Sequence, residues 1–354
     1  MKTVIAFASL DGGRRRAGLL FFCLGVVALA SACGRPGDPL TRWEDLSSAE
    51  SAPWVETRNP DLLSVTRERG PLRVRAGNQE RESTRKPWSG WWLPVNSRYL
   101  FEGTREKPAP LEKLDRWNQK RGVTSQAADY ERRMIYDPNA IAWEGSCDAW
   151  AIAALLEPEP LVPLSKDGVE FSVGDQKALL VKSYELAEGK KLYGQVFHGT
   201  REGIYDDLYP DQLHRFVETE LIEQGRPFVL DKDPGVAVWN TPIWKGQIHV
   251  EDDSSDLQVA HVTMTLWGAD PWVRSMDEVG TRSIALEYTY DLVGERASDG
   301  ALQVHYGFWT STPSGPNSVE LHPDFVATVP DRVAQRGSRN PEIDPSAVDL
   351  LLKH

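Results

Sequence analysis

The residue with the clearest capacity for chemistry is Cys147, which follows the turn-forming pair Gly145-Ser146. The stretch from Cys147 to Leu156 is rich in alanine and leucine and is followed by Pro158, so it predicts a short helix beginning at the cysteine. The preceding serine is a suitable N-cap. Free N–H groups and the positive dipole at a helix N-terminus lower the pKa of a thiol and can hold an oxyanion. We therefore predict a thiol nucleophile; the alternative is a buried, unreactive cysteine.

A thiol nucleophile needs a general base and a group that orients that base. Apart from the C-terminal residue, the histidines are His198, His214, His249, His261, His305 and His322. Spacing does not select among them, and His214 on a predicted helix and His261 at the start of a predicted strand are equally good candidates. The candidate orienting groups are Asp231, Asp233 and Asn240. Asp231 ends an apolar strand, where a carboxylate would be partly desolvated and could hold an imidazole.

The first 32 residues have the pattern of an export signal. Lys2 and Arg14-Arg15-Arg16 precede an apolar stretch over 17–30, which is shorter than the roughly 20 residues that span a bilayer. The small residues at 30–32 and Cys33 resemble the lipobox of bacterial lipoproteins, in which the cysteine is acylated. We predict lipidation at Cys33, with an ordinary secretory signal as the alternative. Cys23 would leave with the signal, so Cys147 would be the one remaining thiol.

Composition excludes several classes of protein. The chain has 354 residues, of which 40% are hydrophobic and 26% charged, as in ordinary globular proteins. The formal charge is −12, and removing residues 1–32 makes it −15. This acid excess argues against nucleic-acid binding, which needs clustered lysine and arginine. Three cysteines rule out a scaffold held by disulfides.

The order of the predicted elements indicates the fold class. Helices are predicted over 110–117, 125–134, 147–156, 175–187, 210–223 and 346–352, and strands over 168–173, 227–231, 237–239, 258–267 and 282–293. Helices first and strands later indicate an α+β fold with a mostly antiparallel sheet. The predicted organisation is a lipoprotein signal peptide at 1–32, a polar tether and N-terminal extension with partial order at 33–85, a catalytic domain at 86–330 and a tail with a short helix at 331–354.

Several stretches together resemble the transglutaminase-elicitor family, named for oomycete cell-wall transglutaminases and also found in bacteria. The sequence V-W-N-T-P-I-W-K-G at 238–246 resembles the surface peptide of the oomycete enzymes that plants detect. The segments G-S-C-D-A-W-A at 145–151 and G-V-E-F-S-V-G-D-Q-K-A-L-L at 168–180 are similar to the family's cysteine motif and the segment after it. The resemblance covers roughly 86–330. Ile141 stands where papain-type proteases have their oxyanion glutamine, which disfavours a plain papain protease.

The resemblance implies acyl transfer from a protein glutamine to an amine, on a papain-like core. It maps the nucleophile onto Cys147, the base onto His214 and the orienting aspartate onto Asp231, and so favours His214 over His261. Transfer to an amine in place of water needs partial exclusion of water. Residues predicted to bind substrate or to form apolar walls are Trp143, Trp150, Trp239 and Asn240.

Calcium is associated with the family's enzymes. Here Glu251-Asp252-Asp253 and Asp256 form an acidic segment that lacks the spacing of an EF-hand, so it predicts a solvated turn. We predict no metal site and no cofactor required for the chemistry, with calcium as an open alternative.

The combined prediction is an exported, lipid-anchored protein-glutamine γ-glutamyltransferase that works through a cysteine thioester. It would act in the bacterial cell envelope, facing the periplasm or the exterior, with protein glutamines as donors and lysine or polyamine acceptors. One alternative is a thiol peptidase or amidase acting on envelope peptides. Another is a non-enzymatic surface lipoprotein that binds a partner through a tryptophan-rich face. No nucleic-acid partner is expected.

Overall fold

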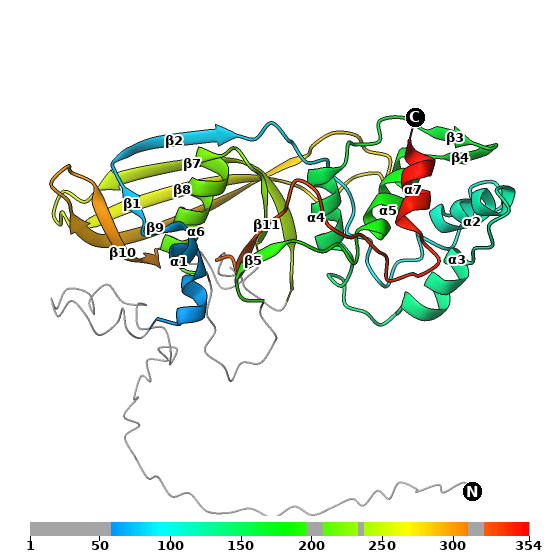
Figure 1. The fold of residues 1–354 in the computed structure, drawn as a ribbon, viewed down its shortest axis with the longest axis horizontal. Helices are drawn as coiled ribbons and strands as arrows, with labels where there is room; N and C mark the ends of the chain where they lie inside the picture. The colour runs from blue at the N-terminus through cyan, green and yellow to red at the C-terminus, as the bar shows by residue number, and fades with distance from the viewer. Residues whose placement is uncertain (1–57, 197–207, 233–236, 311–321, 354) are drawn as a thin grey trace, which may run out of the picture. The chain divides into compact units, whose positions relative to one another are not determined.

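A large antiparallel β-sheet and a group of helices make up the fold (Figure 1). The computed structural model describes residues 58–196, 208–232, 237–310 and 322–353, which fall in one compact unit. The α+β class is confirmed, because helices and antiparallel strands are combined and most of the strands come late in the chain. The papain-like arrangement of the core stays a prediction.

The helices lie close to the predicted positions. The α-helices are α1 (Ser64–Arg69), α2 (Pro110–Lys120), α3 (Ala127–Tyr130), α4 (Cys147–Leu156), α5 (Val173–Ser183), α6 (Pro210–Val217) and α7 (Pro345–Leu352). Shorter helical turns are η2 (Pro60–Leu63), η3 (Glu131–Ile135) and η4 (Glu218–Glu223). No helix in the described part of the chain is long and apolar enough to cross a membrane.

The strands form two sheets. They are β1 (Arg73–Val74), β2 (Gly77–Glu82), β3 (Leu164–Lys166), β4 (Val169–Phe171), β5 (Lys191–Gly194), β6 (Phe228–Asp231), β7 (Asn240–Asp252), β8 (Val259–Ala269), β9 (Ser283–Arg296), β10 (Leu302–Trp309) and β11 (Phe325–Thr328). The large sheet runs in the order β1-β10-β9-β8-β7-β6-β11-β5, with β2 added on β7. Strands β3 and β4 form a separate hairpin.

Two hydrophobic cores support the fold. One lies among α2, α4, α5 and α7 and includes the fully buried Trp150. The other lies where α6 packs on the sheet, and the long strands β7 and β8 bury alternate side chains toward it. Helix α4 contacts both α5 and β7, so it joins the helices to the sheet (Figure 1). Its first residue is the predicted nucleophile.

Residues 58–85 differ from the predicted polar tether. Strand β2 pairs with β7 over six residues and β1 pairs with β10, so this segment belongs to the folded unit. Arg58 lies buried in an ion pair with Asp211 of α6, with 2.6 Å between Nη2 and Oδ1. Both faces of β2 are mostly exposed, so its sequence lacks the alternating hydrophobic pattern that marks a strand.

Candidate active site

Cys147 is the first residue of α4 and is buried, with 7% of its surface exposed. The thiol S–H donates to the carbonyl oxygen of Val238, with 3.4 Å between the two atoms. Asn240 Nδ2 donates to Sγ over the same distance. The sulfur therefore lies between a hydrogen-bond acceptor and a donor, both supplied by the segment that leads into β7.

Asp231 holds that segment in place. This fully buried residue ends β6 and pairs across the sheet with Asn240, the first residue of β7. Its Oδ1 accepts a 2.8 Å hydrogen bond from the backbone N–H of Trp239. Because Trp239 lies between Val238 and Asn240, the carboxylate fixes the backbone that presents both sulfur contacts. Asp231 and Asn240 thus lie near Cys147, while Asp233 lies outside the described residues.

The pKa of the Cys147 thiol differs from the expectation that the helix N-terminus lowers it. Burial raises the pKa of Cys147, and the nearby charges of Asp148 and Asp231 raise it further, whereas the hydrogen bond from Asn240 lowers it. The net direction is upward, so desolvation outweighs the helix N-terminus that favours a thiolate. In the substrate-free protein the sulfur is therefore a neutral thiol near neutral pH.

The turn before α4 is tightly packed. A Cβ atom added to Gly145 would lie 2.5 Å from the carbonyl oxygen of Trp92, so only glycine fits there. That carbonyl accepts a 2.6 Å bond from the N–H of Ser146. Ser146 occupies the N-cap position, but its side chain makes no cap and donates instead to Glu185 Oε1 at 2.9 Å. The first-turn N–H groups of α4 thus have no side-chain cap among the described residues.

Glu185 connects the nucleophile turn to the C-terminal segment. Its Oε1 also accepts from Lys182 at 2.7 Å, and its Oε2 accepts from Ser338 Oγ at 2.9 Å and from the Arg339 N–H at 3.0 Å. Arg339 Nη2 in turn donates to the Gly145 carbonyl oxygen at 3.3 Å. This set, which we call the Glu185 network, was not predicted, because its members are far apart in sequence and only the fold brings them together.

The three tryptophans predicted to form apolar walls differ in their exposure. Trp150 is fully buried in the helical core and cannot touch a substrate, so that prediction is wrong. Trp143 and Trp239 are half-buried and stay candidates. Trp92 and Trp272 pack against Trp239, and neither was predicted to belong to the site. The unusual density of tryptophan near 88–92 was the one signal that could have pointed to Trp92.

His214, the predicted base, lies elsewhere in the fold. It is fully buried on α6, where Nδ1 and the Tyr290 hydroxyl of β9 are 2.8 Å apart, and Nε2 has no hydrogen-bond partner among the described residues. Burial, with a smaller contribution from Arg215, lowers the pKa of His214 to about 3. The structure does not bring this neutral imidazole to Cys147, and the prediction is corrected accordingly.

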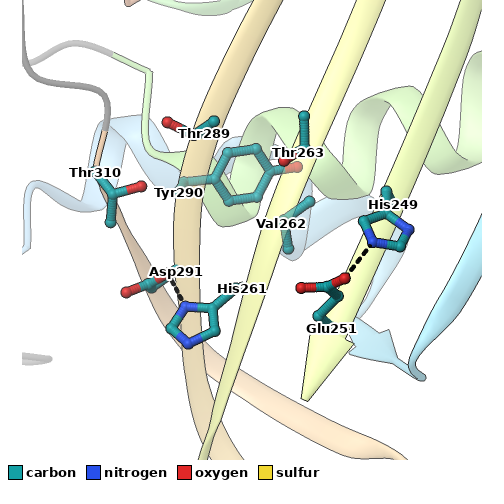
Figure 2. Close-up of a pocket in the computed structure, with 9 residues that line it drawn as sticks. All are labelled: His249, Glu251, His261, Val262, Thr263, Thr289, Tyr290, Asp291 and Thr310. Atoms are coloured by element: carbon teal, nitrogen blue, oxygen red, sulfur yellow. Dashed lines mark hydrogen bonds and ion pairs between the residues drawn. The ribbon is translucent and has the colours of Figure 1, made fainter. Parts of the chain in front are cut away.

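His261, the other candidate base, lies at the far end of the long strands. It pairs with Glu251, eleven residues beyond Asn240 along β7, which corresponds to about 35 Å. Figure 2 shows its Nδ1 bonded to Asp291, at 2.7 Å, in a polar cavity of about 320 Å³. The bond to Asp291 raises the pKa of His261. This residue therefore does not reach the thiol.

The remaining histidines do not complete a triad in the described structure. His249 lines the same cavity, bonded to Glu251 at 2.8 Å (Figure 2). No described histidine makes a hydrogen bond with Cys147, whose polar contacts are Val238 and Asn240. His198 lies outside the described residues. A triad cannot be read from one sequence, because distant segments form it and spacing does not constrain it.

The acidic side chains at the end of β7 and just after it take part in a turn and in an ion pair. Asp253 Oδ1 accepts bonds from the N–H and the hydroxyl of Ser255, and these bonds lower the pKa of Asp253 to about 2. Asp252 pairs with Arg296 at 2.6 Å. Among the described residues, no three His, Cys, Asp or Glu side chains gather to hold a metal ion. The carboxylates instead stabilise a turn and ion pairs.

Comparison with known proteins supports a family relationship. Residues 136–307 match the family model described as Transglutaminase elicitor, a range that includes Cys147, Asp231 and Asn240. This match covers just under half of the chain and supports a relationship to the transglutaminase elicitor family. Its fold is similar to the crystal structure of the GP42 transglutaminase from Phytophthora sojae, with a TM-score of 0.61 and 18% sequence identity. That similarity covers 83% of this chain and 97% of the other chain. No curated protein matches the chain.

Proposed function

We propose that this protein is a transglutaminase-type acyltransferase that transfers the acyl group of a protein glutamine to an amine. The observation that carries the proposal is the single thiol of the described chain, at the N-terminus of α4 and contacted by Asn240, within the segment that matches the family. Lysine side chains and polyamines are the proposed acceptors. We propose no cofactor for the chemistry itself, and calcium is the open alternative.

Cys147 Sγ is the proposed nucleophile. It attacks the glutamine carboxamide carbon, the amide nitrogen leaves as ammonia with the proton from the thiol, and a thioester remains. An amine then attacks the thioester carbon, loses a proton to the returning thiol and forms an isopeptide bond. The first-turn N–H groups of α4 and Asn240 Nδ2 are donors suited to the negative charge that develops on the carbonyl oxygen. Asp231 is proposed as a positioning residue that acts through the Trp239 backbone.

Amine incorporation tests the proposal. Wild-type protein should link a fluorescent amine to casein and release ammonia, with and without calcium, and Cys147→Ala should lose this activity. Cys147→Ser should be slower by several orders of magnitude, because a hydroxyl is a far weaker nucleophile near neutral pH. Incorporation by Cys147→Ala at the wild-type rate would contradict the proposal.

A thiol peptidase or amidase is the second candidate, because it would use the same nucleophile with water as the acceptor. The two differ in products: peptide-bond cleavage without amine incorporation favours the hydrolase. A partner-binding surface protein would show neither activity. Mass spectrometry of a glutamine-containing protein incubated with and without an amine separates the three.

We further propose that the protein is lipid-anchored at Cys33 in the bacterial cell envelope and faces the periplasm or the exterior. The lipobox-like sequence supports this proposal, and the residues concerned lie outside the described structure. Cys33→Ala should move the protein from the membrane fraction to the soluble fraction and abolish labelling with a fatty-acid probe. A variant that stays membrane-bound and acylated would overturn the proposal.

A further inference from the structure

Three indole rings form a compact cluster, which we call the tryptophan platform: Trp92, Trp239 and Trp272. The ring centroids of Trp92 and Trp272 are 4.4 Å apart, those of Trp92 and Trp239 are 5.3 Å apart, and those of Trp239 and Trp272 are 5.7 Å apart. Edge-to-face and tilted contacts of this kind are favourable for aromatic pairs. Each ring therefore restricts the other two.

The platform is joined to the nucleophile by short connections. Trp239 lies between Val238 and Asn240, the two residues that contact Sγ. The carbonyl oxygen of Trp92 accepts the N–H of Ser146, the residue before Cys147. The rings and the thiol are therefore carried by directly connected chain segments.

Trp272 is exposed although it is firmly held. Its backbone N–H donates to Asp270 at 2.9 Å, and its carbonyl oxygen accepts from Arg282 at 2.8 Å. Asp270 and Arg282 also form an ion pair at 3.2 Å. Yet Trp272 is 52% exposed to solvent, whereas Trp92, which packs against it, is 4% exposed. A fixed, exposed aromatic ring next to a reactive group is typical of a binding surface.

The charges around the platform select among occupants. Lys232 Nζ lies 5.9 Å from the Trp239 ring centroid, and the Arg282 guanidinium lies at the Trp272 carbonyl. Asp270 is neutralised by its ion pair with Arg282. Because this pair carries no net charge, Lys232 is the remaining cation at the edge of the platform among the described residues, and it disfavours a positively charged amine acceptor on these rings. The exposed indole surface matches an apolar side chain.

We propose that the tryptophan platform binds an apolar side chain adjacent to the reactive glutamine of the acyl-donor peptide. This assignment rests on the proposed acyltransferase function and names its donor class: glutamines flanked by a leucine-like or aromatic residue. Trp272 is then a specificity-determining residue, because it supplies the most exposed ring. The acceptor amine binds elsewhere around the thiol.

Binding measured without turnover tests this assignment. In the Cys147→Ala background, calorimetry compares a glutamine peptide flanked by leucine with the same peptide flanked by glycine. We expect the leucine peptide to bind about tenfold more tightly, as burial of one leucine side chain allows. The double variant Cys147→Ala/Trp272→Ala should bind both peptides equally, Trp272→Phe should retain part of the preference, and Leu257→Ala, an exposed residue outside the platform, should retain all of it.

Two results would overturn the assignment: equal binding of both peptides to Cys147→Ala, or an undiminished preference in the double variant. In the active enzyme, Trp272→Ala should raise the KM for the leucine peptide about tenfold and leave the KM for the amine unchanged. If Trp272→Ala instead raises the KM for the amine, the platform binds the acceptor, which contradicts the proposal. Because the binding experiment needs no turnover, an absence of acyl transfer would overturn the proposed function without deciding the platform's ligand.

Discussion

Cys147 lies at a helix N-terminus, which favours a thiolate, yet its pKa is raised. The N-terminus of α4 and the bond from Asn240 favour a thiolate, but burial and the nearby carboxylates raise the pKa of the thiol, and their effect is larger. In the proposed reaction, the glutamine therefore meets a thiol that loses its proton as it attacks. The local sequence predicted the helix that begins at Cys147 but not the protonation of the thiol, because burial depends on β7 packing over the start of α4.

We predict the pH dependence of thiol alkylation from this arrangement. In a soluble variant that lacks residues 1–32 and carries Cys33→Ala, the rate of iodoacetamide labelling should keep rising through pH 9, because the pKa lies above the ordinary thiol value of about 8.5. Asn240→Ala removes the side-chain hydrogen bond that lowers the pKa of Cys147, keeps the backbone one, and should shift the curve further upward. A plateau already reached at pH 7.5 would contradict this prediction.

His214 contributes to stability in place of chemistry. Its folded-state pKa of about 3 lies below the ordinary value of 6.5, so the unfolded chain binds a proton that the folded chain excludes. Its contribution is fully present above pH 6.5 and is lost as the pH falls toward 3, at up to about 1.4 kcal/mol per pH unit. His214→Phe should remove this part of the acid dependence in urea unfolding between pH 7 and pH 4.

Activity provides the second readout for this substitution. His214→Phe leaves the Tyr290 hydroxyl without its partner and should cost about 1–2 kcal/mol of unfolding free energy, while amine incorporation stays within a few fold of wild type. Single substitutions of the other histidines, His198 included, complete the comparison. Loss of activity by orders of magnitude in a folded His214→Phe protein would restore His214 as the base.

At the scale of elements, hydrogen bonds of the Glu185 network hold the turn that precedes α4. Burial opposes the charge on Glu185, yet Lys182 and Arg339 lower the pKa of this carboxyl below its ordinary value. The carboxylate joins the end of α5, the nucleophile turn and the C-terminal segment. Residues 331–353, predicted as a tail, therefore include a segment that fixes the turn before Cys147.

We predict that Glu185→Gln destabilises the protein. The substitution keeps the shape of the side chain but leaves Lys182 and Arg339 without this partner, and breaking a buried ion pair costs about 3 kcal/mol. Urea unfolding should show this loss, and kcat should fall more than KM changes, because the nucleophile turn loses its anchor. Glu188→Gln, at an exposed position three residues along, is the matched control. Equal unfolding free energies for Glu185→Gln and wild type would contradict the role of the network.

At the scale of the whole molecule, sequence patterns predicted what is local and missed what is not. The predicted helix over 147–156 is confirmed without a shift, because its composition and the prolines after it define both ends. The strand predicted to end at Asp231 is also confirmed. Residues 58–85 were misjudged as a tether, because an exposed edge strand such as β2 is held by backbone bonds that leave no hydrophobic pattern.

The residues of the candidate site divide in the same way into those that local sequence indicates and those that distant segments supply. Asn240 of the V-W-N motif lies against Cys147, with Trp239 next to it in sequence, whereas Trp272 and the Glu185 network come from distant segments and could not be read from spacing. Pairing of β6 with β7 brings Asp231 opposite Asn240, and packing of α4 on β7 brings the thiol to both. The long sheet then separates this site from the polar cavity around His261.

The central claim is that Cys147 forms a thioester with a glutamine side chain. Mass spectrometry of the protein, mixed with a glutamine peptide in the absence of amine and quenched in acid, tests it most directly. We predict that the peptide containing Cys147 gains the mass of the donor less one ammonia, and that adding an amine discharges it with formation of the amide. An acyl group on another residue, or turnover by Cys147→Ala with no adduct at all, would contradict the claim.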